Sequence, residues 1–292
     1  MTSQISIEEK RFYSEGEAIA SKIYLPEDFN SEKEYTAILL CHGFAGVQDF
    51  LLPTYAENFA GNGFIAITFD YRGFGESSGR NGFLSKKNQI EDIRNALVFT
   101  ESIKYVNAIV LWGTSYGGAN VIETASIEQH KLKGVIAQIA FGNGSRVIFG
   151  DKTEAESEKL MRSIDKILSK QVLNNRTLSL PIKKFMNDEQ SQKFLNENHH
   201  PSMDQTLSFS TMRETIEHKP ENLIAKVNIP ILLVGAEKDS VNPVQETKSL
   251  YEKANDPKKL FIVDNAGHFD LYFGEYFKVN FEKQLAWLLS LN

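Results

Sequence analysis

The sequence predicts an α/β protein with a mostly parallel sheet. Short apolar runs rich in β-branched residues alternate with amphipathic stretches along most of the chain, which is the pattern of buried strands separated by helices. The 292 residues are enough for two domains, or for one large domain that carries an insertion. Hydrophobic residues make up 41% and charged residues 24%, so the chain can bury a large core and is not predicted to be fibrous, coiled-coil or wholly disordered.

The chain begins with two extended segments, residues 5–12 and 18–25, that are separated by Ser-Glu-Gly. We expect them to form an antiparallel hairpin at one edge of the sheet. Four further segments are short, apolar and flanked by Gly, Asn or Asp, and we expect them to be strands buried on both faces: residues 35–41, 64–69, 108–112 and 134–140. Helices are predicted between them at residues 53–60, 87–101 and 118–128. Each strand-helix-strand unit is expected to be right-handed.

The strand pattern disappears between residues 142 and 228, where the sequence becomes polar and helical. We therefore predict that residues 142–228 form an inserted helical cap, and that residues 1–141 and 229–292 form the sheet domain. A capping box, Thr153 to Glu156, precedes a helical stripe made of Leu160, Met161, Ile164, Ile167, Leu168 and Val172. The sheet pattern resumes with strands at 230–235 and 259–263 and helices at 244–254 and 275–291.

The apolar residues of the insertion have two interpretations. They can form ordinary core between the insertion and the sheet domain, or they can line a surface for a ligand. The residues concerned are the helical stripe together with Phe185, Met186, Phe194, Leu195, Phe209 and Met212. We expect the first interpretation to hold for any one of them.

Charge and cysteine content exclude several classes of function. Lys and Arg total 32 against 38 Asp and Glu, so the net charge is −6 and a nucleic-acid partner is not expected. The single cysteine, Cys41, cannot form an internal disulfide and leaves no thiolate cluster for a metal. The start of the chain lacks the pattern of a signal peptide, and no apolar run is long enough to span a membrane. We expect a cytoplasmic protein, and a homodimer is one of the oligomeric states that the sequence allows.

A five-residue motif carries the first indication of chemistry. Gly113-Thr-Ser-Tyr-Gly117 fits the pattern Gly-x-Ser-x-Gly and lies between a predicted strand and a predicted helix. A serine on such a turn has a strained backbone that directs its hydroxyl away from the sheet, and the flanking glycines allow close backbone approach. Ser115 is therefore the candidate nucleophile.

A serine hydroxyl needs a base, and the base needs a carboxylate that orients it. His268 lies in the loop after the last predicted strand, and Asp239 follows the strand before it. Both loops belong to the edge formed by the carboxyl ends of the strands, where the Ser115 turn also lies. Three such residues can follow one another along a chain in six orders. The order Ser115, Asp239, His268 is the one expected of a triad whose serine lies on a strand-to-helix turn.

An acyl-transfer site also needs two N–H donors for the negative oxygen of the tetrahedral intermediate. The segment Cys41-His-Gly-Phe-Ala-Gly46 follows the first parallel strand. The backbone N–H groups of Phe44 and of Tyr116, the residue after the candidate nucleophile, are predicted to face each other and form this oxyanion hole.

These segments together resemble the α/β-hydrolase superfamily. The matching stretches are Leu-Cys-His-Gly-Phe from residue 39, Phe-Asp-Tyr-Arg-Gly-Phe-Gly-Glu-Ser from 69, Gly-Thr-Ser-Tyr-Gly-Gly from 113, Gly-Ala-Glu-Lys-Asp from 235 and Asn-Ala-Gly-His from 265. The resemblance implies an eight-stranded sheet with a cap between the sixth and seventh strands, and it assigns Ser115, Asp239 and His268 to the triad and Phe44 and Tyr116 to the oxyanion hole. The opening segment is similar to that of the dienelactone-hydrolase-like and acyl-peptidase-like branch of serine hydrolases.

Several other residues are interpreted as structural. We expect His42 to hold its loop by hydrogen bonds and Cys41 to be a buried small apolar residue. An internal ion pair between Asp70 and Arg72 is expected to fasten the following Gly-rich loop. Asp270 is a better candidate for a turn or helix cap than for the acid. The insertion histidines, His199, His200 and His218, are expected to be surface or pocket-lining residues because no metal-ligand spacing accompanies them.

The sequence thus predicts a serine hydrolase that cleaves a small-molecule ester or thioester through an acyl-enzyme on Ser115, with no metal or organic cofactor. Three alternatives remain at this point. The same triad serves acyl transfer to an alcohol or amine, it serves hydrolysis of a carbon–carbon bond in a diketone, and a chain of this fold can act as a non-catalytic receptor.

Overall fold

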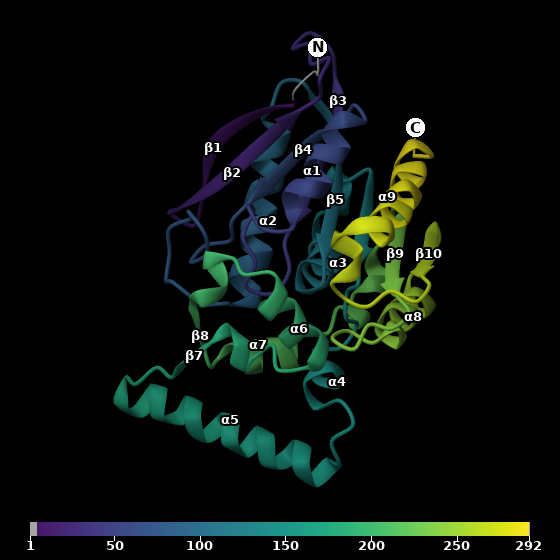
Figure 1. Ribbon diagram of the computed structural model, residues 1–292. Helices are drawn as coiled ribbons and strands as arrows, with labels where there is room; N and C mark the ends of the chain where they lie inside the picture. Colours follow the sequence, from purple (N-terminus) through teal and green to yellow (C-terminus); the bar gives the residue numbers. More distant parts are fainter. Residues whose placement is uncertain (1–4, 292) are drawn as a thin grey trace.

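The computed structural model describes residues 5–291, which fold around one eight-stranded sheet (Figure 1). Its strand order is β1-β2-β4-β3-β5-β6-β9-β10. The strands are β1 (Ser6–Ser14), β2 (Glu17–Leu25), β3 (Tyr35–Cys41), β4 (Ile65–Phe69), β5 (Val106–Thr114), β6 (Gly134–Gln138), β9 (Ile231–Ala236) and β10 (Lys258–Val263). β2 is antiparallel to both β1 and β4, and the other neighbouring pairs are parallel. The predicted edge hairpin and mostly parallel sheet are confirmed.

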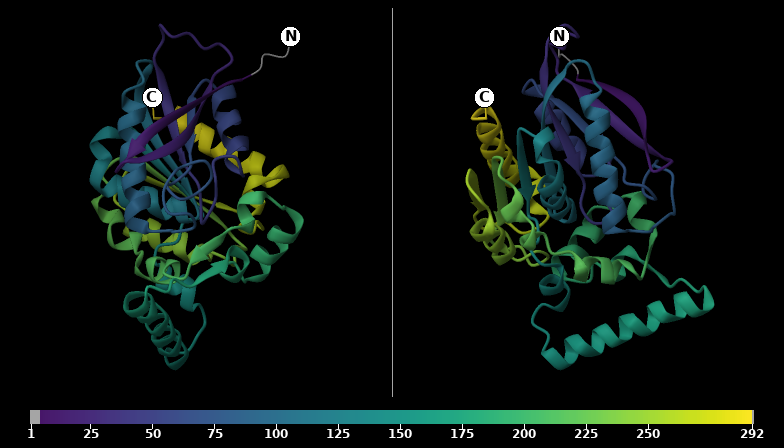
Figure 2. Two further views of the ribbon diagram at one scale, coloured as in Figure 1. Left: turned by 90° about the vertical axis from the view of Figure 1, so that its left-hand side faces the viewer. Right: turned by 180° about the vertical axis from the view of Figure 1, so that it is seen from behind.

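Helices cover both faces of the sheet (Figure 2). They are α1 (Leu52–Gly61), α2 (Lys86–Glu101), α3 (Tyr116–Glu128), α8 (Val244–Lys253) and α9 (Gly274–Leu289). β3 shows how the layers arise, because its successive side chains point to opposite faces. Ile38 and Leu40 join a buried cluster with α1 and α9, and Leu39 joins the cluster that contains α2, α3 and α8. The continuous apolar sequence of β3 therefore reflects burial on both faces, as predicted.

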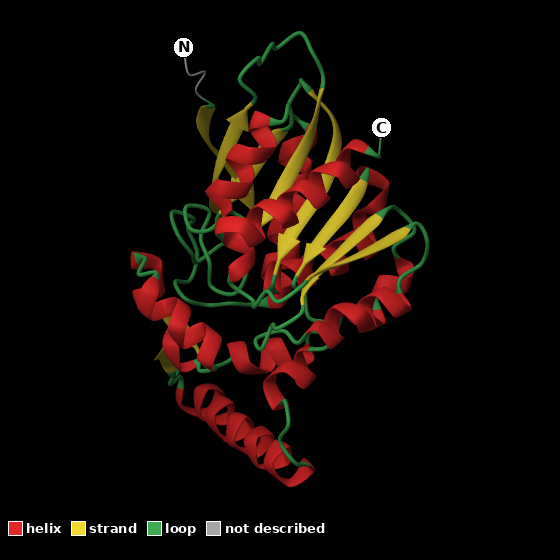
Figure 3. Ribbon diagram, turned by 45° about the vertical axis from the view of Figure 1, so that its right-hand side comes forward, coloured by secondary structure: helices red, strands yellow, loops and turns green. Residues whose placement is uncertain are grey.

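The segment between β6 and β9 lies across the carboxyl ends of the parallel strands (Figure 3). It contains α4 (Gly144–Phe149), α5 (Glu154–Asn174), α6 (Glu189–Glu197) and α7 (Thr211–Glu217), with a two-stranded antiparallel sheet formed by β7 (Ser179–Pro181) and β8 (Thr206–Ser208). We call residues 142–228 the inserted segment. No strand pattern is visible in the sequence here, because strands of three residues are too short to show a period of two.

Single turns of 3-10 helix connect several of these elements. They are Gln129–Lys131, Ile182–Lys184, Pro201–Asp204, Pro220–Asn222, Ile224–Lys226 and Asp270–Tyr272. None of the helices within residues 5–291 combines the length and the apolar character needed to cross a membrane.

α5 begins at the predicted capping box but does not pack as expected. The Glu156 carboxylate accepts the Thr153 amide at 2.8 Å, and the Thr153 hydroxyl accepts the Glu156 amide at 3.3 Å. Within α5 only Ile164 is buried, and Val172 is 83% exposed. The expectation that the apolar stripe packs on the sheet domain is wrong, because α6 and α7 lie between α5 and the sheet (Figure 1).

The loop after β4 is fastened by two carboxylates from different elements. Asp70 accepts hydrogen bonds from the amides of Gln48 at 2.7 Å and Glu76 at 2.9 Å. The Arg72 guanidinium donates instead to Asp92 of α2, with Nε 2.8 Å from the carboxylate. The predicted ion pair between Asp70 and Arg72 is therefore wrong. Closeness in sequence suggested it, and only the packing of α2 against this loop brings Asp92 to Arg72.

An ion-pair network joins the start of the inserted segment to α8. Arg146 of α4 donates to Glu246 of α8 at 2.6 Å and to both carboxylate oxygens of Glu221, at 2.9 and 2.7 Å. Glu246 also accepts the amides of Gly142 and Asn143, each at 2.9 Å. The side chains of Glu221 and Glu246 are each only 6% exposed, whereas that of Arg146 is 43% exposed, so water screens these interactions in part. The network thus fixes the point at which the inserted segment leaves the sheet.

This network predicts a pH-dependent contribution to stability. Hydrogen bonding from Arg146 lowers the pKa of Glu221 from 4.5 to about 2. The contribution is complete above pH 4.5 and is lost as the pH falls toward 2, because the unfolded chain then binds a proton that the folded chain does not. Glu221→Gln should lower the free energy of unfolding at pH 7 by about 2 kcal/mol. The difference from the wild type should shrink between pH 5 and pH 3, as measured by urea unfolding.

Glu217→Gln is the control, because Glu217 belongs to α7 of the same segment and is exposed. Its effect should be small and nearly independent of pH. An equal loss of stability for Glu221→Gln at pH 3 and pH 7 would contradict the assignment.

Candidate active site

Ser115 occupies the sharp turn that joins β5 to α3. Its φ of +56° and ψ of −118° lie in a region that residues with a side chain rarely adopt, at a strain of about 1–3 kcal/mol. Two backbone hydrogen bonds fasten the turn: the Ser115 amide donates to Gln138 of β6 at 2.8 Å, and the Ser115 carbonyl accepts from Ala119 at 3.1 Å. The strained strand-to-helix turn predicted from the sequence is present.

The two glycines of the motif are required by close backbone approach. A Cβ atom on Gly113 would lie 2.3 Å from the carbonyl oxygen of Gly117. A Cβ atom on Gly117 would lie 2.3 Å from the Cys41 oxygen and 2.4 Å from the His42 oxygen. These distances are far below van der Waals contact, and the neighbouring atoms are backbone atoms that cannot rotate away. Close backbone packing therefore holds three segments together: the end of β3, the end of β5 and the start of α3.

Two hydrogen bonds link the three predicted side chains in series. His268 Nε2 lies 3.1 Å from Ser115 Oγ, and His268 Nδ1 lies 2.7 Å from Asp239 Oδ2. His268 is 3% exposed and Asp239 is 6% exposed, so the hydrogen bond between them is shielded from water, whereas Ser115 is half-buried and lines a pocket. This geometry suits the tautomer in which Nδ1–H donates to Asp239 and Nε2 accepts the Ser115 proton.

Backbone amides hold the Asp239 carboxylate in place. Asp239 Oδ1 accepts from the amides of Val241 and Asn242, each at 2.8 Å, which leaves Oδ2 for His268. Asp270 plays no part in this chain of bonds, because its carboxylate accepts the Gly267 amide at 2.7 Å and closes the His268 loop. This is the turn role that the sequence suggested for Asp270.

Asn242 lies next to Ser115, and no motif in the sequence indicated this. Its side-chain amide donates to the Ile139 carbonyl at 2.8 Å and lies 3.4 Å from Ser115 Oγ. A donor in this position leaves the Ser115 hydroxyl free to direct its own proton toward His268. Its position three residues after Asp239 could have indicated that Asn242 lies near Ser115. An asparagine in a loop is, however, more often an ordinary turn residue.

The segments of Phe44 and Tyr116 lie on either side of Ser115. A Cβ atom on Gly43, next to Phe44, would be 3.2 Å from the Cβ of Ser115. Tyr116 is the first residue of α3, so its amide has no acceptor within the helix. Both residues line the same pocket as Ser115, and their ring centroids are 6.1 Å apart.

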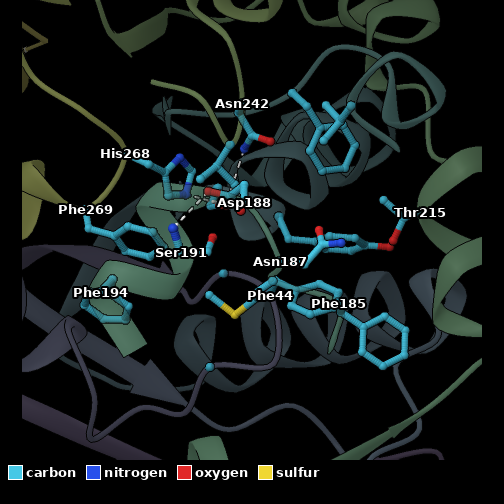
Figure 4. Close-up of a pocket in the computed structure, with 18 of the residues that line it drawn as sticks. Phe44, Phe185, Asn187, Asp188, Ser191, Phe194, Thr215, Asn242, His268 and Phe269 are labelled. Atoms are coloured by element: carbon cyan, nitrogen blue, oxygen red, sulfur yellow. Dashed lines mark hydrogen bonds between the residues drawn. The ribbon is translucent and has the colours of Figure 1, made fainter. Parts of the chain in front are cut away.

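A pocket of about 430 Å³ lies beside Ser115, and its walls come from the sheet domain and the inserted segment (Figure 4). The inserted segment contributes many of its apolar side chains: Val147, Ile148, Leu160, Phe185, Met186, Phe194, Met203 and Met212. Several of these were expected to be ordinary core. Phe185 and Met186 do pack against the core and Phe194 is buried against Phe269, although all three also line the pocket. Leu160 and Met212 line the pocket without joining a core cluster, so for these two the expectation is wrong. Helical periodicity shows that a side chain is shielded from water, but it does not show whether protein atoms or a cavity lie next to it.

Cys41 and His42, at the end of β3, have the structural roles that were predicted. His42 is 2% exposed, its Nδ1 lies 3.1 Å from the Gly43 carbonyl, and its ring packs edge-on against Tyr71. Burial lowers the pKa of His42 to about 4, so the ring is neutral at pH 7. Cys41 is fully buried, and burial raises the pKa of its thiol. Neither side chain is activated for chemistry.

The histidines of the inserted segment differ from one another. His199 is exposed and lies 3.2 Å from Asp204, and His200 stacks on Phe50. His218 was expected at the surface or in the pocket, and this is wrong: it is 0% exposed, with its Nε2 3.2 Å from Glu123. His218 packs against the rings of Tyr116 and Phe141 beside Glu123, all distant in the sequence, so the local sequence does not show this burial. Within residues 5–291 no group of three or more His, Cys, Asp and Glu side chains is arranged to hold a metal ion.

The fold and this site define the chain as an α/β hydrolase. Residues 32–272 match the family described as "Serine aminopeptidase, S33", and the chain belongs to this family. The predicted superfamily is confirmed, whereas the dienelactone-hydrolase-like and acyl-peptidase-like branch stays a prediction.

Several relatives are similar over most of their length. An Escherichia coli protein named "Uncharacterized 31.7 kDa protein in traX-finO intergenic region" is 35% identical over 276 residues, covering 93% of this chain and 95% of that protein. The quorum-quenching protein AidA of Acinetobacter baumannii is 28% identical, covering 86% and 85%. The thiohydrolase aneE of Aspergillus aculeatus is 25% identical, covering 96% and 94%. Among solved structures, the hypothetical protein PA2218 of Pseudomonas aeruginosa matches with a TM-score of 0.86 at 19% identity, covering 100% and 95%.

The close approach at Gly117 gives a testable prediction. Gly117→Ala should lower the free energy of unfolding by roughly 2–3 kcal/mol, because the added methyl group displaces the backbone of Cys41 and His42. Gly61→Ala is the matched control, since a Cβ atom at Gly61 meets nothing within 4 Å. Both substitutions restrict the unfolded chain equally, so the difference between them reports the folded state. Equal unfolding midpoints for the two variants would contradict the prediction.

Proposed function

We propose that this protein is a serine hydrolase that cleaves a carboxylic ester or thioester through an acyl-enzyme formed on Ser115. The observation that carries the proposal is the series of hydrogen bonds that joins Asp239 to His268 and His268 to Ser115, at 2.7 and 3.1 Å. A neutral imidazole fixed in this way can accept the serine proton as the oxygen attacks a carbonyl carbon.

The first half of the reaction forms the acyl-enzyme. Ser115 Oγ attacks the carbonyl carbon while its proton passes to His268 Nε2, and the carbonyl oxygen becomes an oxyanion. The backbone N–H groups of Phe44 and Tyr116 are the proposed donors to this oxygen, and one such donor is worth about 3 kcal/mol in the transition state. His268 then protonates the leaving oxygen or sulfur as its bond to carbon breaks, and Asp239 stabilises the imidazolium in between.

The second half releases the acid. A water molecule takes the place of the leaving group, and His268 removes its proton while its oxygen attacks the acyl carbon. The same two amides hold the second oxyanion, and Ser115 leaves with the proton returned by His268. Every step is proton transfer and acyl exchange, so the proposed reaction involves no metal or organic cofactor.

The pocket and the comparisons favour a small acyl substrate with an apolar part. The walls contain several aromatic and methionine side chains, among them Phe44, Phe185 and Met212. One relative is named a thiohydrolase, which supports a thioester as one of the two substrate classes. In this proposal, residues 142–228 act as a cap on the domain formed by residues 1–141 and 229–292. A cytoplasmic location and a homodimer stay predictions from the sequence.

The test is Ser115→Ala, assayed with nitrophenyl esters and acyl thioesters of varied chain length. Turnover should fall by at least about 10³-fold with the thermal unfolding midpoint nearly unchanged, and a fluorophosphonate probe should label only the wild type. Ser126→Ala is a control, because Ser126 also belongs to α3 but its hydroxyl donates to the Glu123 carbonyl of the same helix. Full hydrolysis by Ser115→Ala would overturn the proposal.

Product analysis extends this test to the fate of the acyl group. The free acid should be the main product even when an alcohol or amine acceptor is added. Dominant transfer to the acceptor would replace hydrolysis by acyl transfer, and cleavage of a diketone in place of the esters would indicate carbon–carbon bond hydrolysis. A wild type that neither turns over any substrate nor reacts with the probe would indicate a receptor.

A further inference from the structure

Gln190, in the first turn of α6, contacts both loops that carry the proposed acid and base. Its side-chain Nε2 donates to the Lys238 carbonyl at 2.6 Å, next to Asp239. Its Oε1 accepts from the backbone amide of His268 at 3.0 Å, and the Ser240 amide lies 3.4 Å from the same oxygen. One side chain of the inserted segment therefore bridges the backbone on both sides of Asp239 and the backbone of His268 itself.

The amide of Gln190 lies against Gly267, the residue before His268. A Cβ atom on Gly267 would be 2.9 Å from Gln190 Nε2 and 3.1 Å from its Cδ and Oε1. A residue with a side chain at this position would thus push the amide group away. The two loops also meet directly, since the Lys238 amide donates to the Ala266 carbonyl at 2.8 Å. Gln190 extends this backbone contact into a small hydrogen-bonded cluster.

A cap begins α6, and a ring contact fixes the helix at this place. Asp188 caps the helix by accepting the Ser191 amide at 2.9 Å. One turn beyond Gln190, the Phe194 ring stacks on the ring of Phe269, with centroids 4.0 Å apart and an angle of 5° between the planes; the two residues lie near His268 in Figure 4. The helix that carries Gln190 is therefore docked on the His268 loop by an apolar contact as well as by hydrogen bonds.

We infer that Gln190 is a positioning residue of the active site, which holds the Asp239 and His268 loops in register from the inserted segment. The inference rests on the proposed function and extends it, because it gives the inserted segment a role in the acid–base machinery as well as in forming the pocket. The Asp239–His268 bond is 2.7 Å long, and its geometry depends on the relative placement of two loops from separate strands. Small displacements of reacting groups change rates strongly, by up to about 100-fold for 1 Å.

Gln190 acts through His268 and Asp239, since it is not among the residues that line the pocket. Its loss is therefore expected to lower kcat while KM changes little. A residue that only supported the substrate-binding wall would show the opposite pattern, with a change in KM.

Gln192 provides a matched control. It is also a half-buried glutamine of α6, but its side-chain amide donates to Lys183 at 3.1 Å and Met186 at 2.5 Å, two carbonyls within the inserted segment. Methionine is close to glutamine in length and helix propensity but makes no comparable hydrogen bonds. The pair Gln190→Met and Gln192→Met therefore compares loss of the loop contacts with loss of contacts inside the inserted segment.

The experiment measures kcat and KM for a nitrophenyl ester, the rate of Ser115 labelling by a fluorophosphonate, and the thermal unfolding midpoint of the full chain. For Gln190→Met we expect kcat and the labelling rate to fall about 10-fold or more, with KM within about twofold of the wild type. For Gln192→Met we expect kcat and the labelling rate to stay within about twofold of the wild type at a similar unfolding midpoint.

A third variant keeps the inference testable if Gln190→Met folds poorly. Gln190→Glu retains an oxygen for the His268 amide but places a carboxylate against the Lys238 carbonyl, so its kcat should lie between those of the wild type and Gln190→Met. The inference would be overturned if either Gln190 variant kept the kcat and labelling rate of the wild type. It would also be overturned if Gln190→Met and Gln192→Met lost kcat and labelling rate equally. Either outcome would leave the proposed function in place. A wild type that neither labels nor hydrolyses esters would overturn both.

Discussion

The site depends on the close approach of three backbone segments at the carboxyl edge of the sheet. Gly113, Gly117 and the Cys41 carbonyl lie so near each other that no side chain fits between them. This contact forces the chain through the turn at Ser115, whose backbone adopts a conformation that an isolated peptide would rarely populate. The surrounding sheet supplies the energy that keeps Ser115 in this state. The position of its hydroxyl is thus a property of the whole sheet edge and not of the motif alone.

The side of the site that carries Asp239 and His268 is held in place differently. The proposed acid and base lie on separate loops after β9 and β10, and loops are the parts of a fold with the fewest internal constraints. Backbone amides orient the Asp239 carboxylate, and the inserted segment adds the Gln190 contacts and the stacking of Phe194 on Phe269. The rigid turn of Ser115 therefore faces the loops of Asp239 and His268, and the position of these two loops depends on the inserted segment.

The inserted segment is attached unevenly. An ion pair between Arg146 and Glu246 holds the beginning of the segment, and α6 is docked on the His268 loop. α5 has only one buried residue, although Leu160 at its inner side lines the pocket. α4 and α6, which make these contacts, also line the pocket through Val147 and Phe194.

The sequence by itself determined the local features of this protein. A continuous apolar run predicted β3, the capping box predicted the start of α5, and the glycines around Ser115 predicted the strained turn. Each of these features depends on residues that are close together in the chain. The Ser115–His268–Asp239 arrangement was also predictable, since parallel strands bring their carboxyl ends to one edge. Only the tertiary structure decided which distant side chains meet. The pairing of Arg72 with Asp92, the burial of His218 and the contacts of Gln190 depend on how elements pack, and residue type and spacing along the chain do not contain that information.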